Sequence, residues 1–466
     1  MGFILSIFYL VVAYFGTATV FGPLAHFHIE LILAALVFFV SLPALPGSLI
    51  LKTSQSTALI GLAIAVFLSV LIGVRWPGGA LQAFLAFIPC AFAYFLVCMH
   101  CNSRRKIQIL VMMLLVVCLF VTAVGAFDLY HGIPASGPPR PLESGSPDYL
   151  LWNFEHPYLL PQRNDAGEWT YRLRGQNFIN DPNDLSQLIV CLIPLMFIFW
   201  RPGRNIRNFV TVLLPMTVLL FGTFLTHSRG ALIALLVMSV IAARRRIGTV
   251  PALLVAAGLF AGAMALQFTG GREISAEAGS SRTALWGESL QLLKSHPLFG
   301  VGSGYSPDQL GQTAHNSILV CAAELGLFGL FFWTMFLLPT CRDALVLDSP
   351  LKVSQATPPI PEEQLFPRPG SGPAAVDQAE INHLGRLMVL SLTGFLVAGL
   401  FLSRAFVMTF FLLGGVVEVI FEMALTQGMV APRMRMARVL PYSGALAIVL
   451  VVLMYIFVRI LNLTKL

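Results

Sequence analysis

Long apolar runs without charge alternate with short polar segments along most of the chain. Ile107–Phe127, Thr211–Leu225 and Ala445–Val458 are examples that contain no Asp, Glu, Lys or Arg. About 20 predominantly apolar residues are enough for an α-helix to cross a bilayer. In lipid, every backbone polar group must find its partner within the segment, so runs of this kind fold as helices. The pattern predicts an all-α polytopic membrane protein.

The apolar runs predict twelve or thirteen transmembrane helices. Pro43 and Pro46 interrupt the end of the second run, so that run can be counted or left out. The expected spans are 3–21, 29–45, 56–74, 80–99, 107–127, 184–200, 207–226, 229–243, 249–268, 314–340, 385–402, 405–425 and 441–461.

The composition excludes several classes of protein. Hydrophobic residues make up 57% of the chain, charged residues make up 11%, and the mean hydropathy is +0.81. Soluble globular proteins are about 25% charged, so an ordinary soluble enzyme is excluded, as are disordered, collagen-like and nucleic-acid-binding proteins. The seven cysteines lie in apolar runs or in expected inner loops. No disulfide framework is therefore predicted.

Lys and Arg gather in alternate loops, and this asymmetry sets the orientation because cytoplasmic loops are rich in these residues. With the N-terminus inside, the inner loops hold clusters such as Arg104–Lys106 and Arg244–Arg246, whereas each short outer turn holds one arginine: Arg75, Arg229 or Arg404. The net charge of +7, from 29 Lys and Arg against 22 Asp and Glu, is then mostly a signal of orientation.

The chain divides into N-terminal helices (1–127), an outer loop (128–183), helices around a Ser-Arg-Gly turn (184–268), a second outer loop (269–313), a helix that begins with His-Asn (314–340), an inner Pro-rich linker (341–384) and C-terminal helices (385–466).

The three long loops differ in character. Residues 148–178 contain both aromatic and charged side chains, a mixture that suits a loop that folds against the membrane or binds a sugar. In the second outer loop, Leu285, Leu290 and Leu293 recur at helical spacing within Ser281–Lys294. This spacing predicts a short amphipathic helix at the membrane surface. The inner loop is rich in proline and predicts an extended connector.

Arg229 is a candidate functional residue, because a charged side chain at membrane depth is costly and by default points to function. The run from 229 to 243 is about 22 Å long at 1.5 Å per residue, less than the ~30 Å of the hydrocarbon core. Arg244–Arg246 anchor its inner end at the cytoplasmic surface. We therefore expect Arg229 to lie below the outer surface in a pocket; the alternative is a guanidinium that extends to lipid headgroups.

His315 begins the 314–340 helix on the outer side and is a candidate general base, because a neutral imidazole accepts a proton near neutral pH. The alternative is a helix cap or a surface histidine. Glu324 lies further along the same helix, half a turn away from the face of His315. We therefore expect Glu324 to contact a neighbouring helix instead of orienting His315.

Two more outer segments place polar or flexible residues next to a span. Glycines at 300, 302 and 304 permit a tight turn and a close backbone approach to a ligand. No strand precedes them and no Lys-Ser/Thr follows, so the pattern of a phosphate-binding loop is incomplete. Asp181 and Asn183 precede an apolar run, which is typical of a helix N-cap.

Three motifs follow one another on the expected outer side. They are His227-Ser228-Arg229-Gly230-Ala231; Ser281-Arg282 with Trp286, leading to His296-Pro297-Leu298 and the glycines 300, 302 and 304; and His315-Asn316 with Leu319, Glu324-Leu325-Gly326 and Gly329. Together they resemble the O-antigen ligase/O-antigen polymerase superfamily of bacterial inner membranes. The resemblance covers about residues 175–335.

The resemblance implies a multi-pass inner-membrane glycosyltransferase that works at the periplasmic face without a metal ion or cofactor. Members transfer a glycan from undecaprenyl diphosphate to an acceptor, which is a lipid A core sugar in ligases and another lipid-linked repeat in polymerases. The family's catalytic histidine maps onto His315, and its two diphosphate-binding arginines map onto Arg229 and Arg282. The other motif residues expected to bind substrate are His227, Gly302 and Asn316.

The sequence favours a ligase-like enzyme and leaves other functions open. A polymerase would use the same chemistry, and a structural partner of a polysaccharide export complex is a further hypothesis. A transporter would predict helices broken by Gly or Pro near the midplane in matching halves, and the sequence shows no such repeat.

Asp-x-Asp, Walker, His-Glu-x-x-His and Gly-x-Ser-x-Gly motifs are absent from the sequence. The expected partners are the lipid-linked glycan donor, the acceptor glycan and membrane lipids, with no nucleic acid.

Overall fold

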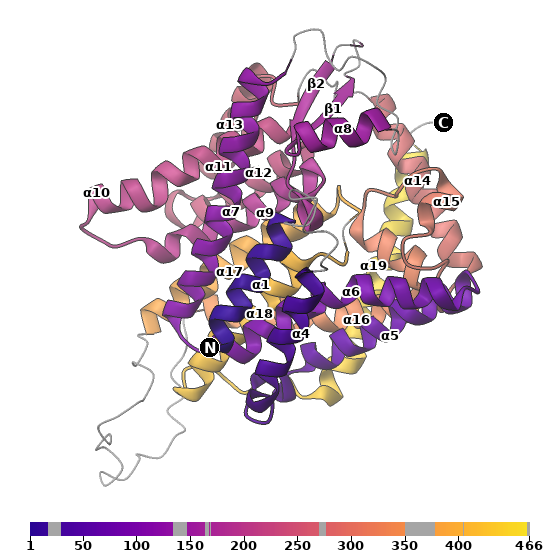
Figure 1. Ribbon diagram of the computed structural model, residues 1–466, viewed down its shortest axis with the longest axis horizontal. Coiled ribbons are helices and arrows are strands. Elements are labelled where there is room, and N and C mark those ends of the chain that lie inside the picture. Colours follow the sequence, from indigo (N-terminus) through magenta and orange to yellow (C-terminus); the bar gives the residue numbers. More distant parts are fainter. Residues whose placement is uncertain are drawn as a thin grey trace.

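The computed structural model describes residues 1–16, 29–133, 147–163, 167, 169–269, 276–349, 378–403 and 405–463. These residues fold as a bundle of helices with a β-hairpin at one end (Figure 1). The helices are α1 (Gly2–Phe15), α4 (Ile29–Ser41), α5 (Ser54–Gly73), α6 (Pro77–His100), α7 (Arg104–His131), α8 (Pro147–Glu155), α9 (Pro182–Leu195), α10 (Asn205–Asn208), α11 (Leu214–Thr226), α12 (Arg229–Ile247), α13 (Thr249–Ala265), α14 (Ala276–Ser295), α15 (Ser306–Leu310), α16 (Ser317–Asp348), α17 (Gln378–Gly399), α18 (Met408–Thr426) and α19 (Met436–Leu463).

The helices match the expected spans. Nine helices in the described ranges are long and apolar enough to cross a membrane. Three shorter apolar helices, Gly2–Phe15, Ile29–Ala44 and Thr249–Ala265, coincide with further expected spans. The remaining expected span corresponds to α12, whose last turn is made of arginines. The all-α polytopic class predicted from the sequence is confirmed.

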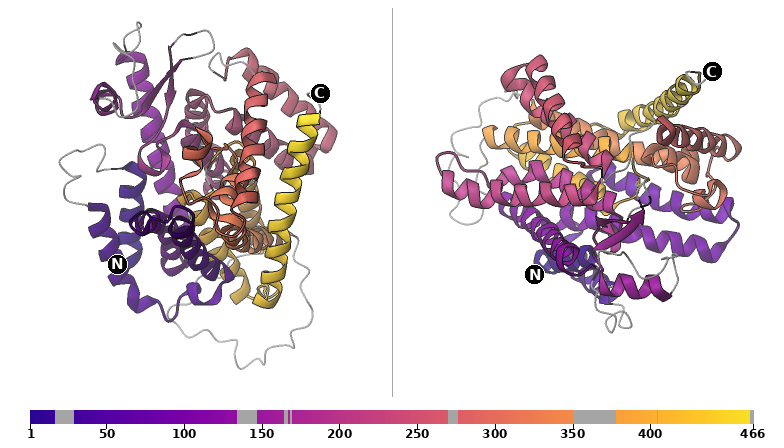
Figure 2. Two further views of the ribbon diagram at one scale, coloured as in Figure 1. Left: turned by 90° about the vertical axis from the view of Figure 1, so that its right-hand side faces the viewer. Right: turned by 90° about the horizontal axis from the view of Figure 1, so that it is seen from above.

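Burial separates the centre of the bundle from its edge. The spans of α9 and α18 are each 83% buried, whereas that of α19 is 11% buried. α16 packs against α5, α17, α18 and α19 and so links both sides of the bundle. α19 lies along the edge (Figure 2) and exposes apolar side chains such as Leu453 and Ile456. In a bilayer, lipid would cover this apolar surface.

α16 is broken in its outer half. Gly326 has φ 65° and ψ −167°, which interrupts the helix. The loop before α15 fills the break: Val301 N and Gly302 N donate to the carbonyls of Ala323 and Glu324, each at 3.0 Å. In return, Leu327 N donates to Pro297 O at 2.8 Å. A Cβ on Gly326 would lie 2.4 Å from the backbone of Leu298, so only glycine fits this crossing.

The first outer loop contains a β-hairpin that the sequence analysis did not predict. β1 (Leu159–Arg163) and β2 (Trp169–Leu173) pair antiparallel, with Leu159 opposite Leu173. Both leucines are fully buried, and Leu173 packs against α7. The rings of Trp152 and Tyr171 stack at 5.8 Å. The aromatic residues of this loop therefore build a small core that holds the hairpin on the bundle.

Several boundaries differ from the expected ones. α16 continues to Asp348 instead of ending at residue 340, because Asp343, Ala344 and Leu347 keep a buried helical face. α17 begins at Gln378 instead of 385, and α1 ends at Phe15, where Gly16 takes a left-handed φ of 58°. Several expected features lie outside the described residues: the end of the first span, most of the Pro-rich linker and Arg404.

The helix predicted in the second outer loop is present as α14, and its position at the membrane surface stays a prediction. α14 covers the expected amphipathic segment and buries Leu285, Trp286 and Leu293 against α16 and α19. Trp286 Nε1 donates to Ala314 O at 2.8 Å, which ties α14 to the residue before His315. All seven cysteines are free.

Candidate active site

The first site residue, Arg229, begins α12 directly after a tight turn. His227 closes α11 in a left-handed conformation with φ 50°, and its Nδ1 lies 3.0 Å from Phe268 O. Ser228 caps α12 by accepting from Ala231 N at 3.4 Å. A left-handed non-glycine residue is strained, and such strain persists where surrounding structure enforces it. The turn thus fixes the backbone that carries the half-buried Arg229.

Arg282 projects from α14 into the neighbourhood of Arg229. Burial lowers the pKa of the Arg282 guanidinium, and the positive charge of Arg229 lowers this pKa further. The structure therefore brings together two cations that are far apart in the sequence. Like charges repel each other, so their proximity in a half-buried place is electrostatically unfavourable.

His315 lies in the segment that leads into α16 and has a left-handed φ of 49°. Its backbone N donates to Ser403 Oγ at 2.8 Å, and Ser403 Oγ in turn donates to Thr313 Oγ1 at 2.6 Å. The next residue, Asn316, caps α16 by accepting from the backbone N of Ile318 and Leu319. These contacts lock the backbone on both sides of the imidazole.

The electrostatic surroundings keep His315 neutral. Burial lowers the pKa of His315, and the nearby Arg282 cation lowers it further, whereas the carboxylate of Asp181 raises this pKa. Among the described residues, no hydrogen bond to the imidazole ring is present. The imidazole of His315 is therefore half-buried, and one arginine, Arg282, lies close enough to lower its pKa.

Asp181 and Arg172 are site residues that the sequence analysis did not assign. Asp181 caps α9 by accepting from Asn183 N at 2.8 Å, which confirms the predicted N-cap. The negative charge of Asp181 also raises the pKa of His315. Arg172 on β2 is buried; its Nε donates to Thr226 O at 2.8 Å and its Nη2 donates to Asn183 Oδ1 at 3.1 Å. In the sequence, the one feature that singles out Arg172 is its position in an outer loop. The positive-inside rule gives no reason for a cation there.

The glycine loop and Glu324 take packing roles in the structure. Glu324 Oε2 accepts from Gly304 N at 2.8 Å, and its Oε1 accepts from Ser306 Oγ at 2.7 Å. Glu324 thus contacts the first residue of α15 and does not orient His315, as expected. A Cβ on Gly302 would lie 2.7 Å from Val74 Cγ2, so this glycine allows the loop to pack on the end of α5. The expected roles of Gly302, His227 and Asn316 in substrate binding stay predictions.

The structure thus brings Arg282 close to both Arg229 and His315 at one end of a polytopic membrane protein. The described residues include no group of three or more His, Cys, Asp and Glu side chains that could hold a metal ion. Residues 214–334 match the family model described as O-antigen ligase. No curated protein matches the chain.

The matched range contains Arg229, Arg282 and His315. The match confirms the resemblance to the O-antigen ligase/O-antigen polymerase superfamily over this part of the chain. It supports a multi-pass membrane enzyme that transfers glycans, of the ligase or polymerase type.

Proposed function

We propose that the protein is an inverting, metal-independent glycosyltransferase that transfers a glycan from undecaprenyl diphosphate to a sugar hydroxyl. Its active site would face the periplasm of a bacterial inner membrane, and its acceptor would be the lipid A core, as in a ligase. The observation that carries the proposal is the electrostatic cluster of Arg229, Arg282 and His315, drawn from three separate segments.

In this proposal the two arginines bind the diphosphate of the donor. A guanidinium presents a fixed fork of donors that matches phosphate oxygens and stays protonated at any working pH. Negative charge grows on the diphosphate as the anomeric C–O bond breaks. Preorganised cations stabilise that charge in the transition state, and the loss of such a donor costs about 3 kcal/mol in known enzymes. Arg229 and Arg282 would therefore stabilise the leaving group.

His315 would act as the general base. Its ring nitrogen takes the proton of the acceptor hydroxyl, whose oxygen attacks the anomeric carbon from the face opposite the diphosphate. The bond from that carbon to the diphosphate oxygen breaks, and its electron pair leaves with the lipid diphosphate. The carbon is inverted. The neutral state of His315 favours this role, because an imidazolium has no lone pair to accept the proton.

The experiment is glycan transfer by the purified, reconstituted protein with an undecaprenyl-diphosphate-linked glycan and a lipid A core acceptor. The His315→Ala variant is expected to insert and fold normally but to lose transfer. His296→Ala is the matched control, because His296 is exposed and, within the described residues, its side chain hydrogen-bonds to the adjacent Ser295 alone. Retained transfer by His315→Ala would falsify the catalytic assignment.

A deletion strain separates the two acceptors. Loss of surface polymer with long glycan chains left on the lipid carrier indicates a ligase. Accumulation of single lipid-linked repeats indicates a polymerase, which would use the same residues. Substrate flux in proteoliposomes that contain no lipid-linked glycan would instead indicate a transporter, the hypothesis from a different class.

A further inference from the structure

A cavity lined by both charged and apolar residues lies at the end of the bundle opposite the candidate active site. Its volume is about 750 Å³. α7 begins at Arg104 in the cavity wall and extends 28 residues, about 42 Å, to the end that carries the hairpin. α18 begins near Ser403 and ends at Thr426 in the same wall. The cavity and the site are therefore separated by the length of the bundle.

Cations dominate the charge of this cavity. Lys52, Arg104, Arg105 and Arg201 line it, against only two carboxylates, Glu380 and Glu422. Four positive charges and two negative ones leave an excess of two. These cations come from loops that the sequence analysis placed on the inner side. The fold gathers them around one cavity, whereas a general orientation signal would need no such convergence.

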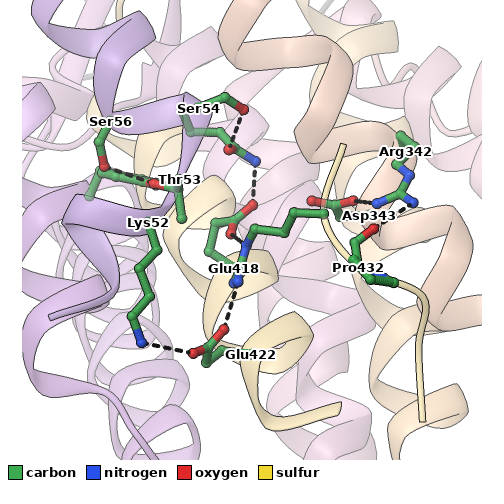
Figure 3. A network of polar contacts seen from close by, with 12 residues as sticks. Lys52, Thr53, Ser54, Ser56, Arg342, Asp343, Glu418, Glu422 and Pro432 are labelled. Carbon is green, nitrogen blue, oxygen red and sulfur yellow. Dashed lines mark hydrogen bonds and ion pairs between the residues drawn. The ribbon is translucent and has the colours of Figure 1, made fainter. Parts of the chain in front are cut away.

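Both carboxylates already have fixed partners. Glu380 pairs with Arg104. Glu422 Oε1 lies 3.5 Å from Lys52 Nζ (Figure 3). Glu422 Oε2 accepts from Arg433 Nη1 at 2.6 Å. Arg433 also donates through its Nε to the buried Glu418 at 3.2 Å. The negative charge of the wall is thus neutralised by the protein itself.

Two guanidinium groups in the wall form no hydrogen bond or ion pair with the described residues. Within the described ranges, Arg105 and Arg201 have no side-chain hydrogen bond or ion pair, and both are exposed residues that line the cavity. The neighbouring backbone is held in place, because Gln108 Nε2 donates to Ile198 O at 3.2 Å and Asn208 Oδ1 accepts from Arg201 N at 2.8 Å. Free cations on a fixed wall can bind phosphate oxygens bidentately.

The remaining wall is partly apolar. Leu49, Met99, Val419 and Met423 contribute hydrocarbon surface beside the cations. A soluble phosphate would leave this surface unused, whereas a phospholipid offers an anionic headgroup and acyl chains together. Basic pockets between transmembrane helices on the cytoplasmic side bind anionic headgroups in this way.

We propose that Arg105 and Arg201 bind the phosphate group of an anionic ligand in this cavity, with a membrane phospholipid as its source. The proposal is independent of the proposed transferase activity, because it uses none of the active-site residues. Loss of lipid binding and loss of glycan transfer are therefore separate results.

The test measures lipid bound to the full-length protein. Protein is reconstituted into phosphatidylcholine vesicles with or without phosphatidylglycerol, extracted in neutral detergent and analysed by native mass spectrometry. The wild type is expected to retain phosphatidylglycerol. The double variant Arg105→Gln/Arg201→Gln is expected to retain at most about one tenth of the amount of phosphatidylglycerol that the wild type retains. The matched control is Arg244→Gln/Arg246→Gln, which removes two exposed arginines outside the cavity and should retain lipid like the wild type.

The outcomes distinguish the sources of phosphate. Competition by inorganic phosphate at the same arginines, without selectivity for phosphatidylglycerol, would support the phosphate site but assign it to a soluble anion. Equal lipid retention by the wild type and the cavity variant overturns the proposal. An equal loss in both double variants also overturns it, because general surface charge would then account for the binding.

Discussion

Arg172 donates its Nε hydrogen to the carbonyl oxygen of Thr226 at 2.8 Å, and this bond joins the outer hairpin to the turn that carries Arg229. The same guanidinium reaches Asn183, which shares the N-cap of α9 with Asp181. One buried side chain therefore sets the relative positions of the Arg229 turn and of the carboxylate that faces His315. Arg172 acts through these groups and is a positioning residue.

The Arg172→Lys variant tests this positioning role. Lysine keeps the charge but loses the fork that reaches two partners. We expect kcat for glycan transfer to fall about tenfold or more, because a small displacement of reacting groups is costly, while the KM of the donor changes little. The control is Arg163→Lys on the same hairpin, whose guanidinium lies over the Trp169 ring at 4.9 Å. Unchanged kcat in Arg172→Lys would contradict the role.

The pH profile of transfer tests the protonation state of His315. Burial and the Arg282 cation hold the pKa of His315 below 6.5. Activity should therefore be constant from neutral pH downward until the pH reaches that lowered pKa, and should fall below it as the imidazole is protonated. An acidic limb above pH 6.5 would argue against this environment.

Two substitutions should move that acidic limb in opposite directions. Arg282 lowers the pKa of His315, so Arg282→Gln should shift the limb to higher pH. Asp181 raises this pKa, so Asp181→Asn should shift the limb to lower pH, and asparagine still caps α9. The measurement is the midpoint of the limb, which is independent of the overall loss of rate. Shifts of the same sign would disprove the electrostatic arrangement.

Removal of one arginine should affect the rate more than the fold. Arg229→Gln and Arg282→Gln are each expected to lower kcat about a hundredfold, the usual cost of losing one donor to transition-state charge. Within the part of the chain that the structure describes, neither side chain forms a hydrogen bond that the substitution would remove from the core. The check is single-turnover transfer together with the melting midpoint in detergent. A parallel drop in melting midpoint would point to a structural role.

Gly326→Ala should destabilise the protein. A Cβ at this position would lie 2.4 Å from the backbone of Leu298, and the φ of 65° is unfavourable for alanine. Overpacking and backbone strain together are expected to cost about 2 kcal/mol or more. Gly311→Ala is the matched control: its φ is 73°, but a Cβ there meets nothing within 4 Å. The difference between the two melting midpoints isolates the steric contact, and equal midpoints would rule it out.

The sequence predicted those parts of the fold that depend on local pattern. Apolar runs marked the spans, leucine spacing marked α14, and Asp181 before an apolar run marked a helix cap. The motifs also pointed to Arg229, Arg282 and His315. These signals are local because each rests on residues within a few turns of one another.

Features that depend on contacts between distant segments could not be predicted. The break at Gly326 requires the loop that begins at Pro297, and a single glycine in an apolar run shows nothing of that crossing. β1 contains Pro161 and is short, so the hairpin gave no clear alternation. The role of Arg172 depends on Thr226 and Asn183, which lie on other elements.

The break in α16 also divides one helix into two units of cooperativity. Helical segments that share no continuous ladder of hydrogen bonds can open separately. The first segment, which follows His315, is bonded to the loop 297–302, whereas the second passes through the buried bundle to Asp348. Amide hydrogen exchange should therefore differ on the two sides of Gly326.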